Sequence, residues 1–347
     1  MRTPLLLFLL ATTLSAEPRI RVTETAGLAR DHEPVRVELA GEEEYVFVTI
    51  GANQTREYAL SELRPSDPLR VEYTGPSGFI LDNAVLRADH SARIFGDRIE
   101  DSGTLKALTY KPFDLTLLRT QNRMHWAPSF QREGEKGYTS IATWPRPQRT
   151  QRELGPGWFI HTREGRHPLY PEIELFAQYR YFAHVPYFLF RAVTSIVEPI
   201  QMYFLRGQEM TMDAFFTHVV FPDKDGKPAI YDFEARKPVL EKSPLAPDVP
   251  WVAFVNLDKG YGFGAITLDY AATTTSGAHL SINDGAQNGK YWDRRLVDQK
   301  TTPLKPGDRY EEESAYVLFH ASRDQPVAEL LEWEKRLRAP LKAEVLP

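Results

Sequence analysis

Side chains that can exchange protons and hold a sugar are concentrated in a few short segments, and the first is 122–128. Arg123, His125 and Trp126 lie there, just ahead of a proline. An imidazole exchanges protons near neutral pH, and an indole offers a flat apolar surface to sugar C–H groups. We therefore predict His125 as a catalytic residue and Arg123 and Trp126 as substrate-binding residues. The competing interpretation is a loop whose histidine caps a turn and whose tryptophan fills the core.

The second segment, 155–167, begins with a Gly-Pro-Gly turn and continues with Trp158, His161 and Arg163. Repeated Arg and His residues suit an anionic substrate such as a uronate. His161 ends an apolar run and is predicted to be catalytic, whereas Trp158 and Arg163 are predicted to bind substrate. The competing interpretation is an exposed basic loop.

The third segment, 205–213, is predicted to be a strand followed by a turn that holds Arg206 and Glu209. A second strand, 215–221, places His218 near its middle. A cation, a carboxylate and an imidazole close together form an acid–base arrangement. We predict Glu209 and His218 as catalytic and Arg206 as substrate-binding, although a lone histidine on a strand is also a common core or surface residue.

Two tyrosines and a later segment complete the candidates. Tyr179 lies in an aromatic-rich strand, and Tyr261 follows a Lys-Gly pair. Either hydroxyl can donate a proton to a leaving oxygen. The segment 281–295 is rich in Asn, Asp and Gly and is predicted to be a loop, and loops on a β scaffold commonly carry function. Trp292 and Arg294 in this segment are predicted to bind substrate.

Several other kinds of site are excluded. The sequence has no phosphate-binding Gly-rich loop, no Gly-x-Gly-x-x-Gly, no His-Glu-x-x-His and no Gly-x-Ser-x-Gly. Because there is no cysteine, thiolate metal sites and cysteine nucleophiles are impossible. Asn283, Asp284 and Asn288 offer oxygen ligands for Ca²⁺, but their spacing matches no defined calcium loop. We predict no cofactor and no metal, with Ca²⁺ as the one ion to test.

The composition is that of a folded, weakly acidic protein. The 347 residues include 42 Lys and Arg against 47 Asp and Glu, which gives a net charge of −5. This net charge does not indicate a basic surface that would bind nucleic acid. The candidate residues instead predict a carbohydrate partner, and the sequence makes no prediction about the oligomeric state.

The first 16 residues have the pattern of a secretory signal peptide. Arg2 precedes an apolar run over 5–11, and small residues follow to Ala16. The run is far shorter than the ~20 residues that a membrane-spanning helix needs. We expect cleavage near Ala16, no membrane span, and a bacterial protein that is secreted or periplasmic and needs no disulfide.

Alternation of apolar and polar residues predicts a mostly β protein. The region 17–75 is predicted to be a small N-terminal β unit, because three segments in it have a period of two. The region 78–325 is predicted to be a large antiparallel β-sandwich that carries the catalytic site. Residues 326–347 are predicted to be a C-terminal helix, over 326–338, and a tail. The predicted strands are 19–23, 35–39, 45–50, 107–110, 115–118, 172–182, 187–197, 200–205, 215–221, 251–256, 262–268 and 314–320.

Three motifs resemble a known superfamily. The Asn-led segment 83–87, the Gly-containing hairpin at 101–108 and the late segment 304–319 with Pro-Gly-Asp are similar to parts of galactose-mutarotase-like β-supersandwich domains. The resemblance covers roughly 78–325. It implies a supersandwich fold of the kind found in aldose mutarotases, in epimerases and in domains of polysaccharide lyases and glycosidases. A fold alone does not choose among these functions.

The combined features favour a secreted carbohydrate-active enzyme, with a polysaccharide lyase ahead of other reactions. β-Elimination at a uronate needs a cation beside the carboxylate, a base for the C5 proton and an acid for the leaving oxygen. Arg123 or Arg206 would supply the cation, one of the three candidate histidines the base, and Tyr179 or Tyr261 the acid.

Two alternatives stay open. A mutarotase or epimerase would use Glu209 as a base, with His125 and His218 as acids. A noncatalytic glycan-binding envelope protein would instead use tryptophans as stacking platforms and would need no cluster of His and Arg.

Overall fold

The computed structural model describes residues 17–65, 69–75, 78–91, 93–95, 98–100, 103–119, 124–126, 128–140, 149–233, 245–273, 277–285 and 289–346. These residues form antiparallel strands, with one α-helix, α2 (Ala328–Arg338), near the C-terminal end of the described chain. The mostly β fold class predicted from the sequence is therefore confirmed. Within the described ranges, no helix is long and apolar enough to cross a bilayer.

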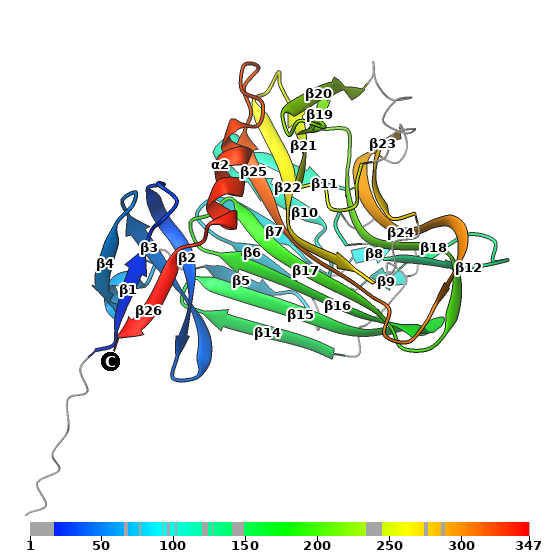
Figure 1. Ribbon diagram of the computed structural model, residues 1–347, viewed down its shortest axis with the longest axis horizontal. Coiled ribbons are helices and arrows are strands. Elements are labelled where there is room, and N and C mark those ends of the chain that lie inside the picture. The colour runs from blue at the N-terminus through cyan, green and yellow to red at the C-terminus, as the bar shows by residue number, and fades with distance from the viewer. Residues whose placement is uncertain are drawn as a thin grey trace, which may run out of the picture.

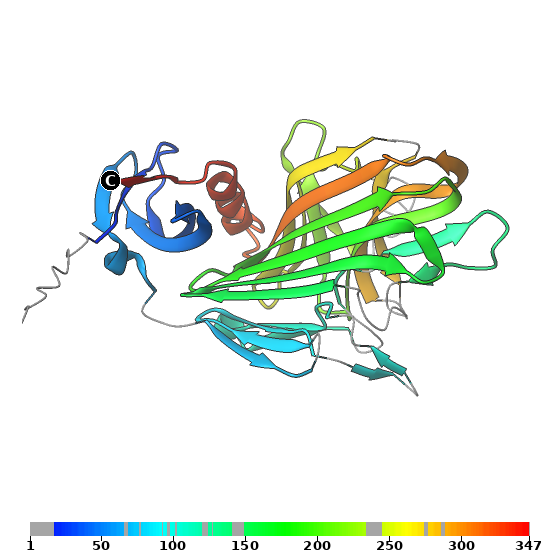
Figure 2. The same ribbon diagram turned by 90° about the horizontal axis from the view of Figure 1, so that it is seen from below.

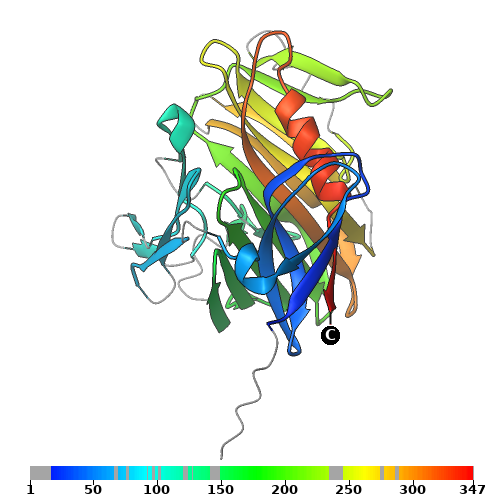
Figure 3. The ribbon, with the colours of Figure 1, turned by 90° about the vertical axis from the view of Figure 1, so that its left-hand side faces the viewer.

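A small β unit contains both ends of the described chain (Figures 1 and 3). β26 (Lys342–Leu346), β1 (Arg19–Thr23) and β4 (Thr55–Ala59) pair in that order, and β2 (Arg30–Leu39) forms a hairpin with β3 (Glu42–Ile50). The short 3₁₀ helix η1 (Leu60–Leu63) follows β4. Alternate residues such as Ile20, Val22, Val46 and Val48 form its core. No strand was predicted for 342–346, because only pairing with β1 makes this tail extended.

A nine-stranded antiparallel sheet is the largest element of the fold (Figure 1). Its strands, in spatial order, are β14 (Arg149–Gly155), β15 (Trp158–His167), β16 (Tyr170–Phe182), β17 (Tyr187–Ile196), β25 (Arg309–His320), β22 (Tyr261–Ala272), β21 (Trp251–Asn256), β19 (His218–Pro222) and β20 (Pro228–Asp232).

Two five-stranded sheets pack against its inner face. One has the order β11 (Leu115–Leu118), β10 (Ala107–Tyr110), β7 (Leu86–Asp89), β6 (Phe79–Asp82) and β5 (Arg70–Tyr73), with η2 (Lys111–Phe113) between β10 and β11. The other has the order β13 (Thr139–Ser140), β12 (Ser129–Arg132), β18 (Ile200–Met212), β24 (Gly289–Leu304) and β23 (His279–Gly285). A separate hairpin joins β8 (Arg93–Phe95) and β9 (Arg98–Glu100). Figure 2 shows the β5–β7 layer beneath the large sheet.

The main core lies between these layers. Inward side chains from all three sheets meet there, among them Phe79, Phe188 and Met210. Asn83, the first residue of the Asn-led motif, ties two layers together: its Nδ2 donates to the Phe182 carbonyl at 2.7 Å, and its Oδ1 accepts from the Leu86 amide at 2.6 Å. The core therefore has the sandwich arrangement that the alternation predicts.

One end of the large sheet's outer face is apolar and covered. Trp251, Val317 and neighbouring residues pack there against Leu330 of α2 and Phe47 of the N-terminal unit. The turn between β14 and β15 contributes to this contact, because Gly157 has φ +91 and a Cβ there would lie 2.8 Å from the Phe47 ring. The N-terminal unit and α2 thus cover this end of the face.

The turn predicted within 205–213 and the loop predicted for 281–295 are wrong, because both segments belong to long strands. In 155–167 the Gly-Pro-Gly turn is confirmed, but the competing interpretation of the segment as an exposed basic loop is wrong. The 155–167 segment contains all of β15, and 205–213 continues β18 with register shifts near Arg206 instead of a turn. The 281–295 segment runs through β23 into β24. Polar residues dominate these segments, but pairing with strands on either side keeps the backbone extended.

Candidate functional site

Away from its covered end, the outer face of the large sheet becomes polar. Side chains alternate between the two faces of a strand, so Glu174, Phe176, Gln178 and Arg180 of β16 all point outward. The register with β15, β17 and β25 aligns these residues in rows across the sheet. Successive rows are Arg166, Glu174, Ser195 and Arg309; Glu164, Phe176, Val193 and Glu311; and Thr162, Gln178, Arg191 and Glu313.

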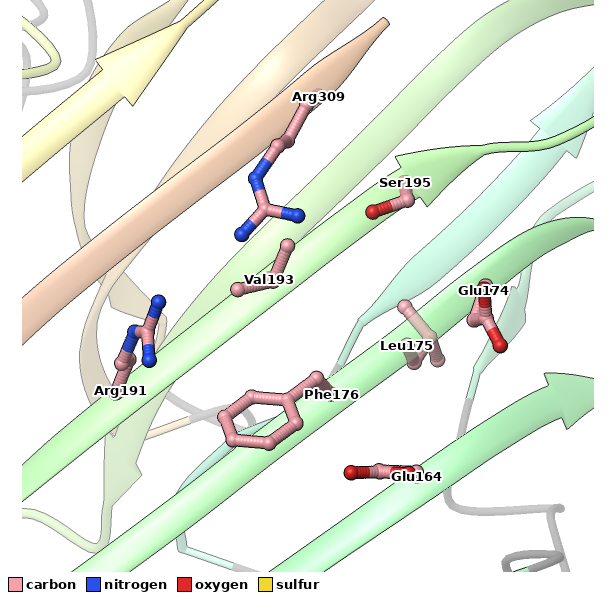
Figure 4. Close-up of a pocket in the computed structure, with 8 residues that line it drawn as sticks. All are labelled: Glu164, Glu174, Leu175, Phe176, Arg191, Val193, Ser195 and Arg309. Atoms are coloured by element: carbon pink, nitrogen blue, oxygen red, sulfur yellow. The ribbon is translucent and has the colours of Figure 1, made fainter. Parts of the chain in front are cut away.

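A pocket of about 310 Å³ lies over these rows. Its volume is at the lower end of the range of about 300–1,000 Å³ that is typical of small-molecule sites. It is open to solvent along the sheet surface, and its lining is drawn in Figure 4: Glu164, Glu174, Leu175, Phe176, Arg191, Val193, Ser195 and Arg309.

The pocket has a cationic side and an acidic side. Figure 4 shows Arg191 and Arg309, from β17 and β25, on one side of Phe176, and Glu164 and Glu174, from β15 and β16, on the other. The Arg191 guanidinium carbon lies 5.7 Å from the centroid of the Phe176 ring. A ligand in the pocket would therefore meet an apolar floor between groups of opposite charge.

Glu311 holds the two arginines in position. Arg309 Nη2 donates to its Oε2 at 2.9 Å, and Arg191 Nε donates to its Oε1 at 2.7 Å. Burial acts to raise the pKa of Glu311, but the hydrogen bonds from Arg309 and Arg191 hold this pKa below its usual value. A guanidinium has five N–H donors, so each arginine can bind a further anion without leaving Glu311.

A further ion pair lies on the outer face between its polar region and its covered end. Arg180 forms an ion pair with Glu313, and its Nη1 donates to the Tyr45 hydroxyl of the N-terminal unit at 3.4 Å. Burial acts to lower the pKa of Arg180, but Glu313 and Tyr45 raise it above its usual value, so the guanidinium stays charged.

His125 and Tyr179, two predicted catalytic residues, meet in the interior. His125 Nδ1 lies 2.9 Å from Tyr179 Oη, and Gln208 Nε2 lies 2.8 Å from His125 Nε2. Because an amide NH₂ only donates, His125 Nε2 accepts and Nδ1 carries the proton. Both side chains are fully buried, and burial lowers the pKa of His125 well below its usual value.

His161 and Arg163 also face the core, from β15, with no exposed surface. The His161 ring packs edge-on against Phe79 with centroids 4.9 Å apart. Burial, followed by the charge of Arg163, lowers the pKa of His161 well below its usual value. Trp126 and Trp292 lie in the same core.

Arg206 and Glu209, predicted from one segment, are brought together on β18. Arg206 Nη2 lies 2.6 Å from Glu209 Oε2, and Arg206 Nη1 lies 3.4 Å from Asp293 Oδ2 on β24. Burial raises the pKa of Asp293 despite its arginine neighbours. This cluster is on a five-stranded sheet and not in the pocket of Figure 4.

The remaining predicted residues are dispersed. Arg294 is buried and pairs with Glu312, and Trp158 Nε1 donates to Glu44 at 3.2 Å under the N-terminal unit. His218 lies on β19, 3.7 Å from Asp232. Tyr261 donates to the Phe215 carbonyl at 3.0 Å, and burial raises its pKa.

Some predictions fall outside the described residues. They are Arg123, the 1–16 segment, Asn288 and the side chain of Asp284. None of the predicted residues lines the pocket of Figure 4. Their functional roles stay predictions, and a substrate would reach the interior ones only if the sheets parted.

The residues that do line the pocket are not among those predicted from the sequence. Glu164 lies in the segment whose competing interpretation is a basic loop, and no functional role is predicted for Glu174, Arg191 or Arg309. One signal was present: 174–180 reads Glu-x-Phe-x-Gln-x-Arg, which puts polar groups on a single face of a predicted strand.

No family model matches the chain, and no curated protein matches it in sequence. Solved structures match its fold. An α-mannosidase from Enterococcus faecalis V583 aligns with a TM-score of 0.54 and 10% identity, over 96% of this chain and 41% of that one. A Glycosyl Hydrolase Family 38 protein from Enterococcus faecalis aligns with a TM-score of 0.53 and 10% identity, over 96% of this chain and 42% of that one.

A galactose mutarotase-like protein from Lactobacillus casei ATCC 334 also matches, with a TM-score of 0.45 and 9% identity, over 70% of this chain and 100% of that one. The chain spans about two fifths of the length of each of the two Enterococcus structures. At these identities the likeness is one of fold. Galactose mutarotase-like proteins, which the sequence motifs resemble, are thus among the solved structures that match.

Proposed function

We propose that this protein is a carbohydrate-active enzyme that binds an acidic saccharide in the pocket on the outer face of the large sheet. One observation carries the proposal: Arg191 and Arg309 face Glu164 and Glu174 across the ring of Phe176. Arginines recognise a carboxylate, and an aromatic ring accepts the apolar face of a sugar. The structures of similar fold are named as an α-mannosidase and a Glycosyl Hydrolase Family 38 protein, which supports the choice of substrate class.

The finer hypothesis is a lyase that acts by β-elimination on a uronate. Arg191 and Arg309 would neutralise the uronate carboxylate, which makes the C5 proton more acidic. Glu164 or Glu174 would take that proton, and the other, in its protonated form, would give a proton to the O4 leaving group. The C5–H and C4–O bonds break and a C4=C5 double bond forms, so the reaction as drawn uses no cofactor.

We also propose that the chain is exported, with 1–16 as its signal peptide. The division into a small β unit over 17–75, a catalytic sandwich over 78–325 and a C-terminal helix and tail over 326–347 is part of the same proposal. An acidic polysaccharide outside the cytoplasm is the natural substrate of such a protein.

A second candidate function is glycan binding without turnover. Glu174 is exposed and Glu164 forms only an exposed ion pair with Arg149, so neither occupies the dry surroundings in which catalytic carboxylates are usually tuned. This observation favours a binding protein that uses the same pocket.

The first experiment is a screen of the purified chain against uronate-containing polysaccharides, with and without EDTA. The ultraviolet absorbance of the new double bond reports elimination. A rise on one substrate, lowered roughly 100- to 10,000-fold in kcat/KM by Glu174→Gln or Glu164→Gln, would establish the lyase and its base.

The control variant is Glu209→Gln, which alters the Arg206 cluster and leaves the pocket intact. If it abolishes turnover while both pocket variants stay active, the reaction belongs to that cluster. Saccharide binding without any rise in absorbance would favour the binding protein, and a change in optical rotation of a free sugar would favour a mutarotase. A loss of activity on EDTA treatment would show that a metal is needed.

A further inference from the structure

The N-terminal unit has a hollow of its own, separate from the pocket on the large sheet. Its volume is about 280 Å³, close to that of the sheet pocket. It is formed where β2, β3, β4 and η1 meet, and its lining is His32, Phe47, Thr49, Arg56, Tyr58, Glu62, Leu63 and Arg64. A smaller hollow of about 130 Å³ lies beside it and shares Leu63 and Arg64.

Among the described residues, two arginines on the wall of this hollow have no acidic side chain within ion-pair distance, although Arg64 lies near enough to Glu17 for their charges to attract. Within the described part of the chain, Arg56 and Arg64 form no ion pair. Arginines elsewhere in the same unit are neutralised: Arg21 pairs with Glu57, and Arg36 pairs with Glu43. Within the lining these two guanidiniums face one carboxylate, that of Glu62, so the lining itself carries a net positive charge.

The other polar groups of the hollow are already engaged. The Glu62 carboxylate accepts from the Ala59 amide at 2.9 Å, which occupies one oxygen of the acidic group in the lining. His32 Nδ1 lies 2.8 Å from Asp31 Oδ1. Neither of these groups is within ion-pair distance of an arginine in the hollow.

The walls of the hollow are fixed. Tyr58 donates from its hydroxyl to the Thr49 carbonyl at 2.7 Å, which links β4 to β3. The Arg56 guanidinium carbon lies 4.8 Å from the centroid of the Tyr58 ring, so the cation is held against an aromatic face. Because this contact restrains Arg56, an anion bound there costs less conformational entropy than one bound by an unrestrained surface arginine.

We infer that this hollow is a second binding site for an acidic saccharide, in which Arg56 and Arg64 hold a carboxylate or sulfate group. A planar, bidentate anion matches the guanidinium fork. The volume accommodates a sugar residue, whereas the Thr49 hydroxyl is engaged, since it donates to Asp31 Oδ1 at 3.0 Å. The choice of a saccharide rests on the proposed function, whereas the preference for an anion rests on the hollow alone.

Two sites on one chain would increase retention on a polymer. Phe47 lines the hollow and also packs against the turn before β15, so the hollow adjoins the covered end of the face that carries the pocket. One polysaccharide that touches both sites would bind more tightly than either site alone allows.

The test measures binding of a uronic-acid trisaccharide to the full chain by titration calorimetry, with sodium sulfate as a second probe. The variants are Arg56→Ala/Arg64→Ala for the hollow and Arg191→Ala/Arg309→Ala for the sheet pocket. Arg70→Ala/Arg87→Ala removes the same charge from exposed arginines that line neither site. Circular dichroism and the Tm show that each variant is folded.

The inference predicts two binding events for the trisaccharide. The hollow variant should lose one of them by at least tenfold in Kd, and the pocket variant should keep it. Equal binding by the hollow variant and the Arg70/Arg87 control would overturn the inference. Binding of sulfate but not of trisaccharide in the hollow would overturn its saccharide part.

The two proposals fail in different ways. Loss of saccharide binding only in the hollow variant would support the second site and count against the pocket as the substrate site. Loss only in the pocket variant would do the reverse.

Discussion

The inner and outer faces of the large sheet are built from alternate residues of the same strands, yet they hold polar groups in opposite ways. On the inner face of β16, Tyr179 and Tyr181 are fully buried, and their hydroxyls meet His125 and His90 at 2.9 and 2.6 Å. On the outer face of β17, Arg191 is paired but keeps 40% of its side chain exposed. The comparison shows that residue type alone does not mark a site. Among the two faces, only the outer one has charged side chains that a ligand can reach from solvent.

The inner network is electrically neutral. His90 Nδ1 donates to the Gly103 carbonyl at 2.8 Å, so its Nε2 accepts from Tyr181. Burial lowers the pKa of His90 to about 3, and the carbonyl bond only partly offsets this. A neutral, hydrogen-bonded network stabilises the packing of the sheets but has no proton ready to exchange near pH 7.

The largest effect that would test this comparison is the loss of stability in acid. His90, His125 and His161 all have pKa values below normal when folded, whereas in the unfolded chain they take up protons near pH 6.5. Their contribution to the free energy of unfolding is complete above pH 6.5. It falls as the pH drops, and for His90 the fall continues down to about pH 3. Each histidine steepens the loss by about 1.4 kcal/mol per pH unit, so the three together approach roughly 4 kcal/mol per unit.

Urea unfolding of the chain between pH 7.5 and 4.5 measures this slope. His90→Asn should reduce this slope by about 1.4 kcal/mol per pH unit, the contribution of one histidine, whatever the variant does to stability at pH 7.5. A free energy of unfolding that stays level over this range would show that the interior histidines are open to water, and the contrast between the two faces would disappear.

A smaller effect is expected when one inner residue is removed. His125→Ala leaves a cavity and takes a partner from Tyr179 and Gln208, so we expect a loss of roughly 2 to 4 kcal/mol in the free energy of unfolding. Tyr179→Phe removes one hydroxyl and should cost about 1 kcal/mol. If His125→Ala instead kept its stability and lost turnover, the catalytic role predicted for His125 would be restored.

The smallest effect concerns two ion pairs on the outer face. Arg180 and Glu313 have 14% and 30% of their side chains exposed, whereas Arg149 and Glu164 have 62% and 32% exposed. Arg180→Ala should cost about 1 to 3 kcal/mol, because Glu313 loses its partner and Tyr45 loses a contact. Arg149→Ala, the matched control, should change stability by less than about 0.5 kcal/mol. Equal losses of stability in thermal or urea unfolding would show that solvent exposure does not determine how much each ion pair contributes.

Much of the fold could be predicted from local pattern. β1, β10, β11 and β21 have the predicted bounds, and α2 begins two residues after the predicted start of the helix. Period-two alternation and turn residues are local properties, so a single strand reveals them. The strands that were missed contain interior polar residues such as His161 and Arg163, which reduce the contrast between the two faces.

The candidate site was much less predictable. His, Trp and Arg draw attention because they are chemically versatile, but a folded core also uses them where each polar atom can find a partner. Arg191 and Glu311 are 120 residues apart in the chain and meet because β25 returns to pair with β17. Local pattern carries no information about such a pairing.

The sequence by itself determined that the chain is mostly β, that a helix lies near 326–338, and that cysteine chemistry is absent. These properties depend on residue type and on spacing over a few positions. The tertiary structure alone decided which of the alternating faces became the core, and that Glu164, Glu174, Arg191 and Arg309 share one pocket. The physical reason is that strand order and register are set by contacts between distant segments, and a shift of one residue would exchange the two faces.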